Sequence, residues 1–307
     1  MHASWSTEGP RSTSAVADYQ DLIPVYDALP DDNELHDQLF DGPGCFVVRR
    51  VFDAETMDRL NRWTDATLEA TASDPNATHP LQPDKRLINR LLERMAESDP
   101  ELLAELLESE RFWAVADALL GFACVGSATI HRLGPGGRRQ EDHVDYPLHL
   151  HSSPFWAASV ERLKRLVTRH QVNHVLPYHS VQALVAVDAM DEENGSTQVV
   201  PYSQLKDDVD VRVHDPEFRK LLTFYSVKLQ PGDVLLFNRR LVHRGGGNST
   251  DRPRNALIFQ LVHLFASPQE KLDAEAVIRA LRHVSSSFEE LALRLEQPYP
   301  RDVCLAT

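Results

Sequence analysis

The segment His243-Arg244-Gly245-Gly246-Gly247-Asn248-Ser249-Thr250-Asp251-Arg252-Pro253-Arg254 joins two apolar stretches of this 307-residue chain, Leu241–Val242 before it and Asn255–Gln260 after it. Its three consecutive glycines and its proline are typical of a connection between two strands. The segment begins with the imidazole of His243 and ends with the guanidinium of Arg254. A second imidazole and a carboxylate lie in His143-Val144-Asp145, and Asp145 precedes His243 by 98 residues. Both segments fall at expected strand ends, where side chains from opposite sheets can converge on one ion.

His143, Asp145 and His243 are our candidate metal ligands and catalytic residues. Two imidazoles and one carboxylate can occupy one face of a six-coordinate metal and leave the opposite face open for a co-substrate and O₂, which is the arrangement of non-haem Fe(II) oxygenases. The tripeptide alone is weak evidence, because a chain with 14 His residues contains such patterns by chance. Taken alone, His143 and Asp145 fit a hydrogen-bonded loop pair better.

Arg254 changes this interpretation. An enzyme that uses 2-oxoglutarate needs a cation near the metal for the distal carboxylate, and the planar fork of Arg meets a carboxylate through two parallel bonds. Arg254 opens the strand after His243, so we expect it about one strand spacing from the metal. Arg252 precedes Pro253 and is expected in an exposed turn. The alternative for Arg254 is a surface charge at the start of a strand.

The composition excludes several classes of protein. The net charge of −14 argues against nucleic acid and against an anionic membrane surface as partners. Three widely spaced cysteines without a C-x-x-C pair indicate reduced thiols and a cytoplasmic protein. Neither a signal peptide nor a membrane-spanning apolar stretch is evident.

Helices and strands alternate along the chain in a pattern that favours a β-sandwich or barrel with helical flanks. We expect helices after Asp53, over 85–95, from Pro100 to Gly121, over 154–171 and within 268–296. Expected strands are Cys45 to Arg50, Cys124 to Leu133, Val181 to Asp188, Thr197 to Pro201 (as a hairpin with the preceding strand), Tyr225 to Leu229, Val234 to Phe237 and Asn255 to His263. Residues 1–25 are expected to be flexible and residues 26–307 to form a single domain.

The chain resembles the phytanoyl-CoA dioxygenase family of Fe(II)/2-oxoglutarate oxygenases over roughly residues 40–265. The matching pieces are Gly44 to Arg50, His143 to Asp145, Glu193 to Pro201, Pro231 to Phe237, and His243 to Arg254, with Arg254 eleven residues after the distal His as in the family. The resemblance implies a mainly β fold with flanking helices and a double-stranded β-helix (jelly-roll) core.

The resemblance also implies the cofactors: Fe(II) on His143, Asp145 and His243, with 2-oxoglutarate held by Arg254 and O₂ as oxidant. Oxidative decarboxylation to succinate and CO₂ then drives hydroxylation, desaturation or ring closure at an unactivated C–H bond. Two positions depart from the family: Tyr202-Ser203-Gln204 stands where Gly-Ser-His is usual, and Gly245 where a small hydroxyl residue often helps to hold the co-substrate. Thr129, His131 or Gln182 could replace that lost contact, although a core hydrogen bond is as good an interpretation for each.

Two other functions stay open at this stage. One is a cupin-like metal-binding jelly-roll acting as a hydrolase or isomerase, and the other is a binding module without catalysis. Halogenases of the family have a small residue in place of the carboxylate, so Asp145 favours hydroxylation. The primary substrate is expected to be a small molecule from natural-product or amino-acid metabolism. Residues 150–180, with Arg162 and Arg169, are expected to form a lid, and a homo-oligomer is left open.

Overall fold

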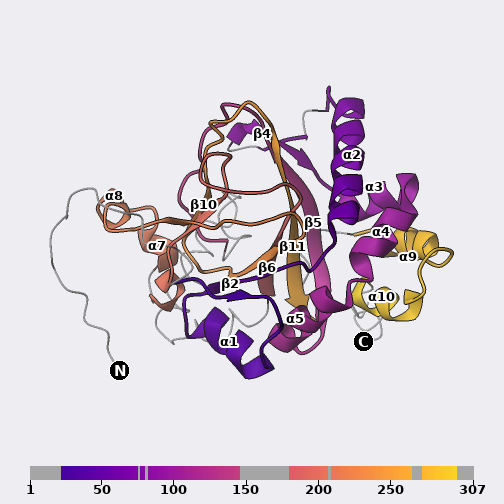
Figure 1. Ribbon diagram of the computed structural model, residues 1–307, viewed down its shortest axis with the longest axis horizontal. Helices are drawn as coiled ribbons and strands as arrows, with labels where there is room; N and C mark the ends of the chain where they lie inside the picture. The colour runs from indigo at the N-terminus through magenta and orange to yellow at the C-terminus, as the bar shows by residue number, and fades with distance from the viewer. Residues whose placement is uncertain are drawn as a thin grey trace, which may run out of the picture.

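The computed structural model describes residues 22–74, 77–79, 82–145, 180–206, 209–264 and 272–295. Two β-sheets face each other, one of eight strands in the order β1-β2-β9-β6-β11-β5-β4-β3 and one of three strands in the order β10-β7-β8. All pairings are antiparallel except the one between β1 and β2. The architecture is therefore mixed α/β with large antiparallel sheets, and helices make up more of it than a mainly β fold implies (Figure 1).

The strands fall close to the expected segments. Their bounds are β1 Val25–Tyr26, β2 Cys45–Val48, β3 Thr78–His79, β4 Gln82–Ile88, β5 Ala123–Leu133, β6 Ser180–Ala186, β7 Thr197–Val199, β8 Tyr225–Ser226, β9 Val234–Asn238, β10 His243–Gly245 and β11 Arg254–His263. Ile23 is fully buried and β1 starts at Val25, so the packed chain begins slightly before the expected boundary at residue 26.

The long strands are apolar on both faces because each face has its own core. In β6, Val181, Ala183 and Val185 belong to the large core that also contains Met57, Leu103 and Phe112 of the helices. Leu184 and Ala186 point the other way, into a smaller core shared with Val199 of the three-stranded sheet. Successive strand residues alternate between faces, so this single pattern separates a helix-facing side from an interior between the two sheets.

The helices gather mainly on one side of β5 and β11, whereas β10, α7 and α8 lie on the other (Figure 1). Their bounds are α1 Asp32–Phe40, α2 Ala54–Ala70, α3 Leu91–Ser98, α4 Pro100–Leu107, α5 Glu110–Leu120, η6 Ser203–Leu205, α7 Val209–Arg212, α8 Pro216–Arg219, α9 Ala274–Leu281 and α10 Phe288–Leu295. The carboxylate of Asp53 accepts a hydrogen bond from the Thr56 N–H at 2.8 Å, which confirms the expected cap of α2.

Three expectations about local structure were wrong. Residues 85–88 continue strand β4 instead of opening a helix, because Lys85 and Leu87 lie opposite Leu133 and His131 of β5. The helix expected from Pro100 to Gly121 is two helices, because Ser109 caps a new one through the Phe112 N–H. Strand β7 pairs with β10 and β8, so it does not form a hairpin with β6. The helix expected over 154–171 lies outside the described residues.

The turn before β9 fixes how the sheet meets the helices. Gly232 has a φ of +85°, and its carbonyl oxygen accepts hydrogen bonds from the N–H groups of Val51 and Phe52. A Cβ at this position would lie 2.0 Å from the Phe52 carbonyl oxygen. Gly232 is therefore required twice, by its left-handed backbone and by the close approach of another chain segment.

Among the residues that the structure describes, no helix combines the length and the apolar character needed to cross a membrane.

We expect Gly232→Ala to lower the free energy of unfolding far more than Gly121→Ala. Gly121 also has a positive φ, of 77°, but a Cβ there would meet no atom within 4 Å. Gly121→Ala should cost about 1 kcal/mol, from left-handed strain partly offset by a less flexible unfolded chain. Gly232→Ala should cost about 1–3 kcal/mol more from overpacking. Urea unfolding of the two variants measures the difference, and equal midpoints would contradict this packing.

Candidate metal centre

His143 and His243 are brought together by their own backbones. The N–H of His143 donates to the carbonyl of His243 at 3.1 Å, and the N–H of His243 donates back at 3.0 Å. This reciprocal pair adds the His143 segment to the edge of β10, and it leaves the two imidazole centroids 4.3 Å apart. The sequence had suggested that a strand ends at His243. In the structure, His243 instead begins β10.

Asp145 completes a group of three. Its Oδ1 lies 3.8 Å from Nε2 of His143 and its Oδ2 lies 3.7 Å from Nε2 of His243. One ligand atom from each residue fits within 4.8 Å of the others, a spacing suited to one metal ion. The donor set of two imidazoles and a carboxylate fits Fe(II) with open coordination positions.

The two rings are oriented for metal binding. Nδ1 of His143 lies 2.8 Å from the carbonyl oxygen of Glu141, and Nδ1 of His243 lies 3.0 Å from that of Leu241. An Nδ1–H that donates to a carbonyl leaves Nε2 with its lone pair directed elsewhere. In both residues, therefore, Nε2 is the available ligand atom, and in both it faces Asp145.

The local electrostatics favour the protonation states that ligands need. Burial and the neighbouring His243 lower the pKa of His143 to about 4, which keeps its ring neutral at pH 7. Burial alone would raise the pKa of Asp145, but His243, His143, Arg239 and the Gln182 hydrogen bond hold it below its ordinary value. Asp145 is thus ionised and acts only as an acceptor.

Two side chains hold Asp145 in place. The Gln182 Nε2 donates to Asp145 Oδ2 at 2.9 Å, and Nη2 of Arg239 donates to the Asp145 carbonyl at 3.2 Å. In return the Asp145 N–H donates to the Arg239 carbonyl at 2.8 Å. Gln182 was expected near the co-substrate, and the structure places it against the carboxylate.

An ion-pair cluster around the buried carboxylate of Asp142 stabilises both histidine segments. Asp142 precedes His143 and accepts hydrogen bonds at 3.0 Å from both Arg244, which follows His243, and Arg219 of α8. Burial would raise the pKa of Asp142, but these two arginines hold it below its ordinary value. Arg244 also lies over the Phe224 ring, with its guanidinium carbon 3.7 Å from the centroid. The sequence analysis missed this cluster because its members are spread over residues 142–244.

Arg254 and Lys85 are two buried cations on the interior face. Both lie directly opposite Leu133 of β5, Lys85 from β4 and Arg254 from β11, so the three side chains share one face of the sheet. Nη2 of Arg254 donates to the Gly195 carbonyl, whereas its buried Nε has no hydrogen-bond partner among the described residues. Burial lowers the pKa of Arg254 to about 10.

Lys85 was not among the site residues predicted from the sequence, because its segment was interpreted as helical. Burial, with the charge of Arg254, lowers its pKa to about 7, although Asp145 acts in the opposite direction. The alternation of Lys85 with Leu87, which is typical of a strand, is the sequence signal that could have revealed its inward position.

Arg254 does not lie one strand away from His243, as the sequence had suggested, because β10 and β11 belong to different sheets. Arg252 is exposed, as expected.

Thr129 and His131 lie on the interior face of β5. The Thr129 hydroxyl is 3.1 Å from Nε2 of His131, so its polar group already has a partner within the protein. Burial and the charges of Lys85, His79 and Arg254 lower the pKa of His131 well below its ordinary value.

Gly245, at the position where the family often has a hydroxyl, donates its N–H to Oε1 of Gln140 at 3.1 Å. The expected lid over residues 150–180 lies outside the described residues.

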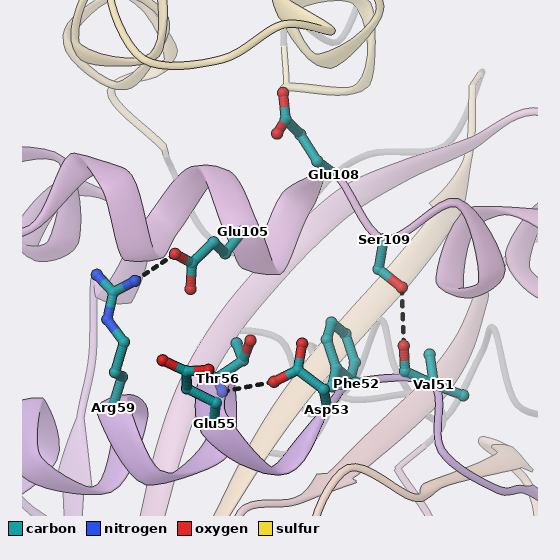
Figure 2. Close-up of a pocket in the computed structure, with 9 residues that line it drawn as sticks. All are labelled: Val51, Phe52, Asp53, Glu55, Thr56, Arg59, Glu105, Glu108 and Ser109. Atoms are coloured by element: carbon teal, nitrogen blue, oxygen red, sulfur yellow. Dashed lines mark hydrogen bonds and ion pairs between the residues drawn. The ribbon is translucent and has the colours of Figure 1, made fainter.

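A cleft of about 460 Å³ lies elsewhere, between the start of α2 and the junction of α4 with α5 (Figure 2). Its polar groups already serve the fold. Asp53 caps α2, Arg59 pairs with Glu105, and Ser109 donates to the Val51 carbonyl at 3.1 Å. Glu108 points away from these groups and accepts hydrogen bonds from Ser285, Ser286 and Ser287. The metal-ligand group contributes nothing to this cleft.

Two facing antiparallel sheets with a two-histidine, one-carboxylate group between them define a metal-dependent oxygenase of the non-haem iron class. Residues 40–256 match the family model described as phytanoyl-CoA dioxygenase (PhyH), and the chain belongs to this family.

Two fungal relatives agree with this assignment. The dioxygenase trt7 of Aspergillus terreus is 25% identical over 232 residues, which span 73% of this chain and 71% of the relative. The iron/alpha-ketoglutarate-dependent dioxygenase penM of Penicillium thymicola is 24% identical over 278 residues, spanning 86% and 79%.

Solved structures share the fold. The alpha-ketoglutarate-dependent epimerase SnoN from nogalamycin biosynthesis, solved with Fe³⁺, alpha-ketoglutarate and nogalamycin RO, superposes with a TM-score of 0.53 at 17% identity, covering 76% of this chain and 84% of SnoN. The carbocyclase SnoK of the same biosynthesis gives 0.54 at 16% identity, covering 75% and 83%.

The chain is thus a dioxygenase that depends on iron and 2-oxoglutarate, as the resemblance had implied. The family and both fungal relatives are named as dioxygenases, which argues against the alternative of a non-oxygenase hydrolase or isomerase.

We expect His243→Ala to abolish binding of Fe(II) or of Co(II) as its substitute, because the remaining His143 and Asp145 offer only two ligand atoms on one face. His214→Ala is the matched control, since His214 is exposed. Isothermal titration with Co(II) measures the affinity, and circular dichroism checks that the fold is kept. Wild-type affinity in His243→Ala would remove this residue from the ligand set.

Proposed function

We propose that this enzyme hydroxylates an unactivated C–H bond of a small natural product, with His143, Asp145 and His243 as the iron ligands. The overall reaction converts R–H, O₂ and 2-oxoglutarate to R–OH, succinate and CO₂. Bound to these three residues, iron would supply the activation of O₂ that is coupled to decarboxylation of 2-oxoglutarate. The observation that carries the proposal is the convergence of the three ligand atoms within 4.8 Å in a family of dioxygenases.

We assign the core to a double-stranded β-helix. The bridge between His143 and His243 supplies a further segment to the sheet β10-β7-β8. Four segments then face the four central strands β5, β11, β6 and β9, which is the strand count of a jelly roll.

Arg254 is the residue we assign to the distal carboxylate of 2-oxoglutarate. Its buried Nε–H has no partner within the described part of the chain, and an unsatisfied buried donor costs about 1–3 kcal/mol. A carboxylate arriving beside the guanidinium would satisfy this donor and neutralise the charge. Lys85, on the same face and across Leu133, would add a second positive charge to the same anion.

Asp145 favours hydroxylation over halogenation, because a carboxylate ligand leaves fewer positions for a halide. Gln182 holds this carboxylate, and we assign Gln182 to positioning Asp145. Thr129 stays a predicted neighbour of the co-substrate. The natural-product substrate is supported by the origin of SnoN and SnoK in nogalamycin biosynthesis. A cytoplasmic location and the possibility of a homo-oligomer also stay predictions.

We expect Arg254→Lys to raise the Michaelis constant for 2-oxoglutarate while the constant for the primary substrate changes little. Lysine keeps the charge but loses the two-pronged contact, at a cost of about 1.5–3 kcal/mol, or roughly 10- to 150-fold. Arg252→Lys is the control, because Arg252 is exposed two residues earlier. Succinate release at varied 2-oxoglutarate measures the constants. An unchanged constant in Arg254→Lys would move the carboxylate site elsewhere.

We also expect 2-oxoglutarate binding to weaken as the pH rises through about 7, the pKa of buried Lys85 in the free protein. Below this value the ammonium is present and attracts the carboxylate. Above it, each binding event must first restore a proton, so the dissociation constant increases by up to about tenfold per pH unit. The titratable groups that interact electrostatically with Lys85 are Arg254, Asp145, His79, His131 and His143.

Lys85→Met should remove this pH dependence and bind 2-oxoglutarate more weakly at low pH. Titration calorimetry in a pH series on both sides of 7, with the metal loaded, tests this expectation. A wild-type dissociation constant that is flat across the series would show that Lys85 does not face the co-substrate.

A further inference from the structure

Four interior side chains form a row across neighbouring strands beside the metal centre. Gln260 of β11 lies directly opposite Ser127 of β5 on one side and Gln182 of β6 on the other, and Gln182 lies opposite Phe237 of β9. Directly opposed residues of an antiparallel sheet share a face, with Cβ atoms about 4.5–5.5 Å apart. Strands β6, β11 and β5 lie side by side in the centre of the molecule (Figure 1), and β9 pairs with the other edge of β6.

The row touches the ligand group at two points. Gln182 donates to Asp145 Oδ2 at 2.9 Å, and the Phe237 ring lies 4.8 Å from the His243 ring, centroid to centroid. Gln260 is the cross-strand neighbour of Gln182. It therefore lies one side chain away from the carboxylate ligand, and six residues along β11 from Arg254.

Two amide oxygens in this row are buried without a partner among the described residues. They are Oε1 of Gln182 and Oε1 of Gln260, in side chains of residues that are 8% and 2% exposed. The orientation of Gln182 is fixed, because an ionised carboxylate only accepts and the amide nitrogen must face Asp145. An unsatisfied buried acceptor lowers stability, so two of them side by side in the interior indicate a role in binding.

The backbone around Gln260 is adapted to its position. The register of β11 against β5 shifts between Gln260 and Leu261, as a β-bulge does when it redirects a side chain. Gly126 of β5 leaves the space for the amide, because a Cβ there would lie 3.3 Å from Cδ of Gln260 and 2.8 Å from Val262. Bulge and glycine together fix where the Gln260 amide can lie.

We propose that the amide oxygens of Gln260 and Gln182 form an acceptor pair that binds a neutral hydroxyl group of the primary substrate beside the iron. This inference rests on the proposed function and adds the substrate class, an alcohol. Amide oxygens accept from O–H or N–H donors and give a carboxylate nothing to bind. The positive charges of Lys85, Arg239 and Arg254 disfavour an ammonium group in the same interior.

The first test is stability without substrate. Replacing Gln260 by Leu removes an unsatisfied buried acceptor at similar volume, so Gln260→Leu should raise the urea midpoint of the metal-loaded, substrate-free protein. Gln204→Leu is the matched control. Gln204 is also buried, and its Oε1 has no partner among the residues that the structure describes. Its Nε2, however, donates to the Gly42 carbonyl at 2.8 Å, and losing that bond should lower the midpoint.

The second test is recognition. Borneol, 1-adamantanol and further polycyclic alcohols, each paired with its own methyl ether, are titrated into the Zn(II)-loaded protein without turnover. The wild type should bind the best alcohol about tenfold more tightly than its ether, the worth of one hydrogen bond. Gln260→Leu should bind both members of the pair equally, whereas Gln204→Leu should keep the preference.

The outcomes separate this inference from the proposed function. A lower midpoint in Gln260→Leu, or an alcohol preference that is absent from the wild type or survives in Gln260→Leu, would overturn the acceptor pair and leave Gln260 as a structural residue or a water ligand. Loss of iron or 2-oxoglutarate dependence would overturn the proposed function instead. The alcohol preference is read from binding alone, so the two failures are distinguishable.

Discussion

The reciprocal backbone pair between His143 and His243 is the constraint on which the metal centre depends. These hydrogen bonds, at 3.1 and 3.0 Å, join segments a hundred residues apart. Once they form, the two imidazoles must lie on the same side, and Asp145, two residues on, is brought to both Nε2 atoms. The buried carboxylate of Asp142 strengthens this junction through Arg244 and Arg219. Ligand geometry is thus set by main-chain pairing and held by ion pairs around it.

Residues that act through a local pattern could be predicted from the sequence. The His143-Val144-Asp145 tripeptide, the cap at Asp53 and the strand Arg254–His263 are each visible in a short stretch of chain. Features that depend on which strands pair could not. Lys85 was placed in a helix because 85–95 carries helical periodicity, and only pairing with β5 reveals the strand. Likewise, Gln182 and Gln260 become neighbours through the register of β6 and β11.

The interior is polar at both ends, and its middle is apolar on β6 and β11 but polar on β5. Lys85 and Arg254 share a row with Leu133, and Gln182 and Gln260 share another with Ser127 and Phe237. Between these rows, β6 and β11 contribute apolar residues such as Leu184 and Ala256, whereas β5 contributes the hydrogen-bonded pair Thr129 and His131. Buried cations and unpaired amides cost stability that apolar residues would restore. The large apolar core between the sheet and the helices offsets this cost.

The two-residue strand β1 has a consequence for the behaviour of the chain in solution. It runs parallel to β2, whose four residues Cys45–Val48 are all buried, and the carbonyl groups of Pro24 and Tyr26 accept the N–H groups of Val47 and Arg49. Without this cover, β2 would be an apolar edge with open hydrogen-bonding groups, the kind of surface on which strands of separate molecules pair. A few residues at the start of the described chain therefore act against self-association into aggregates.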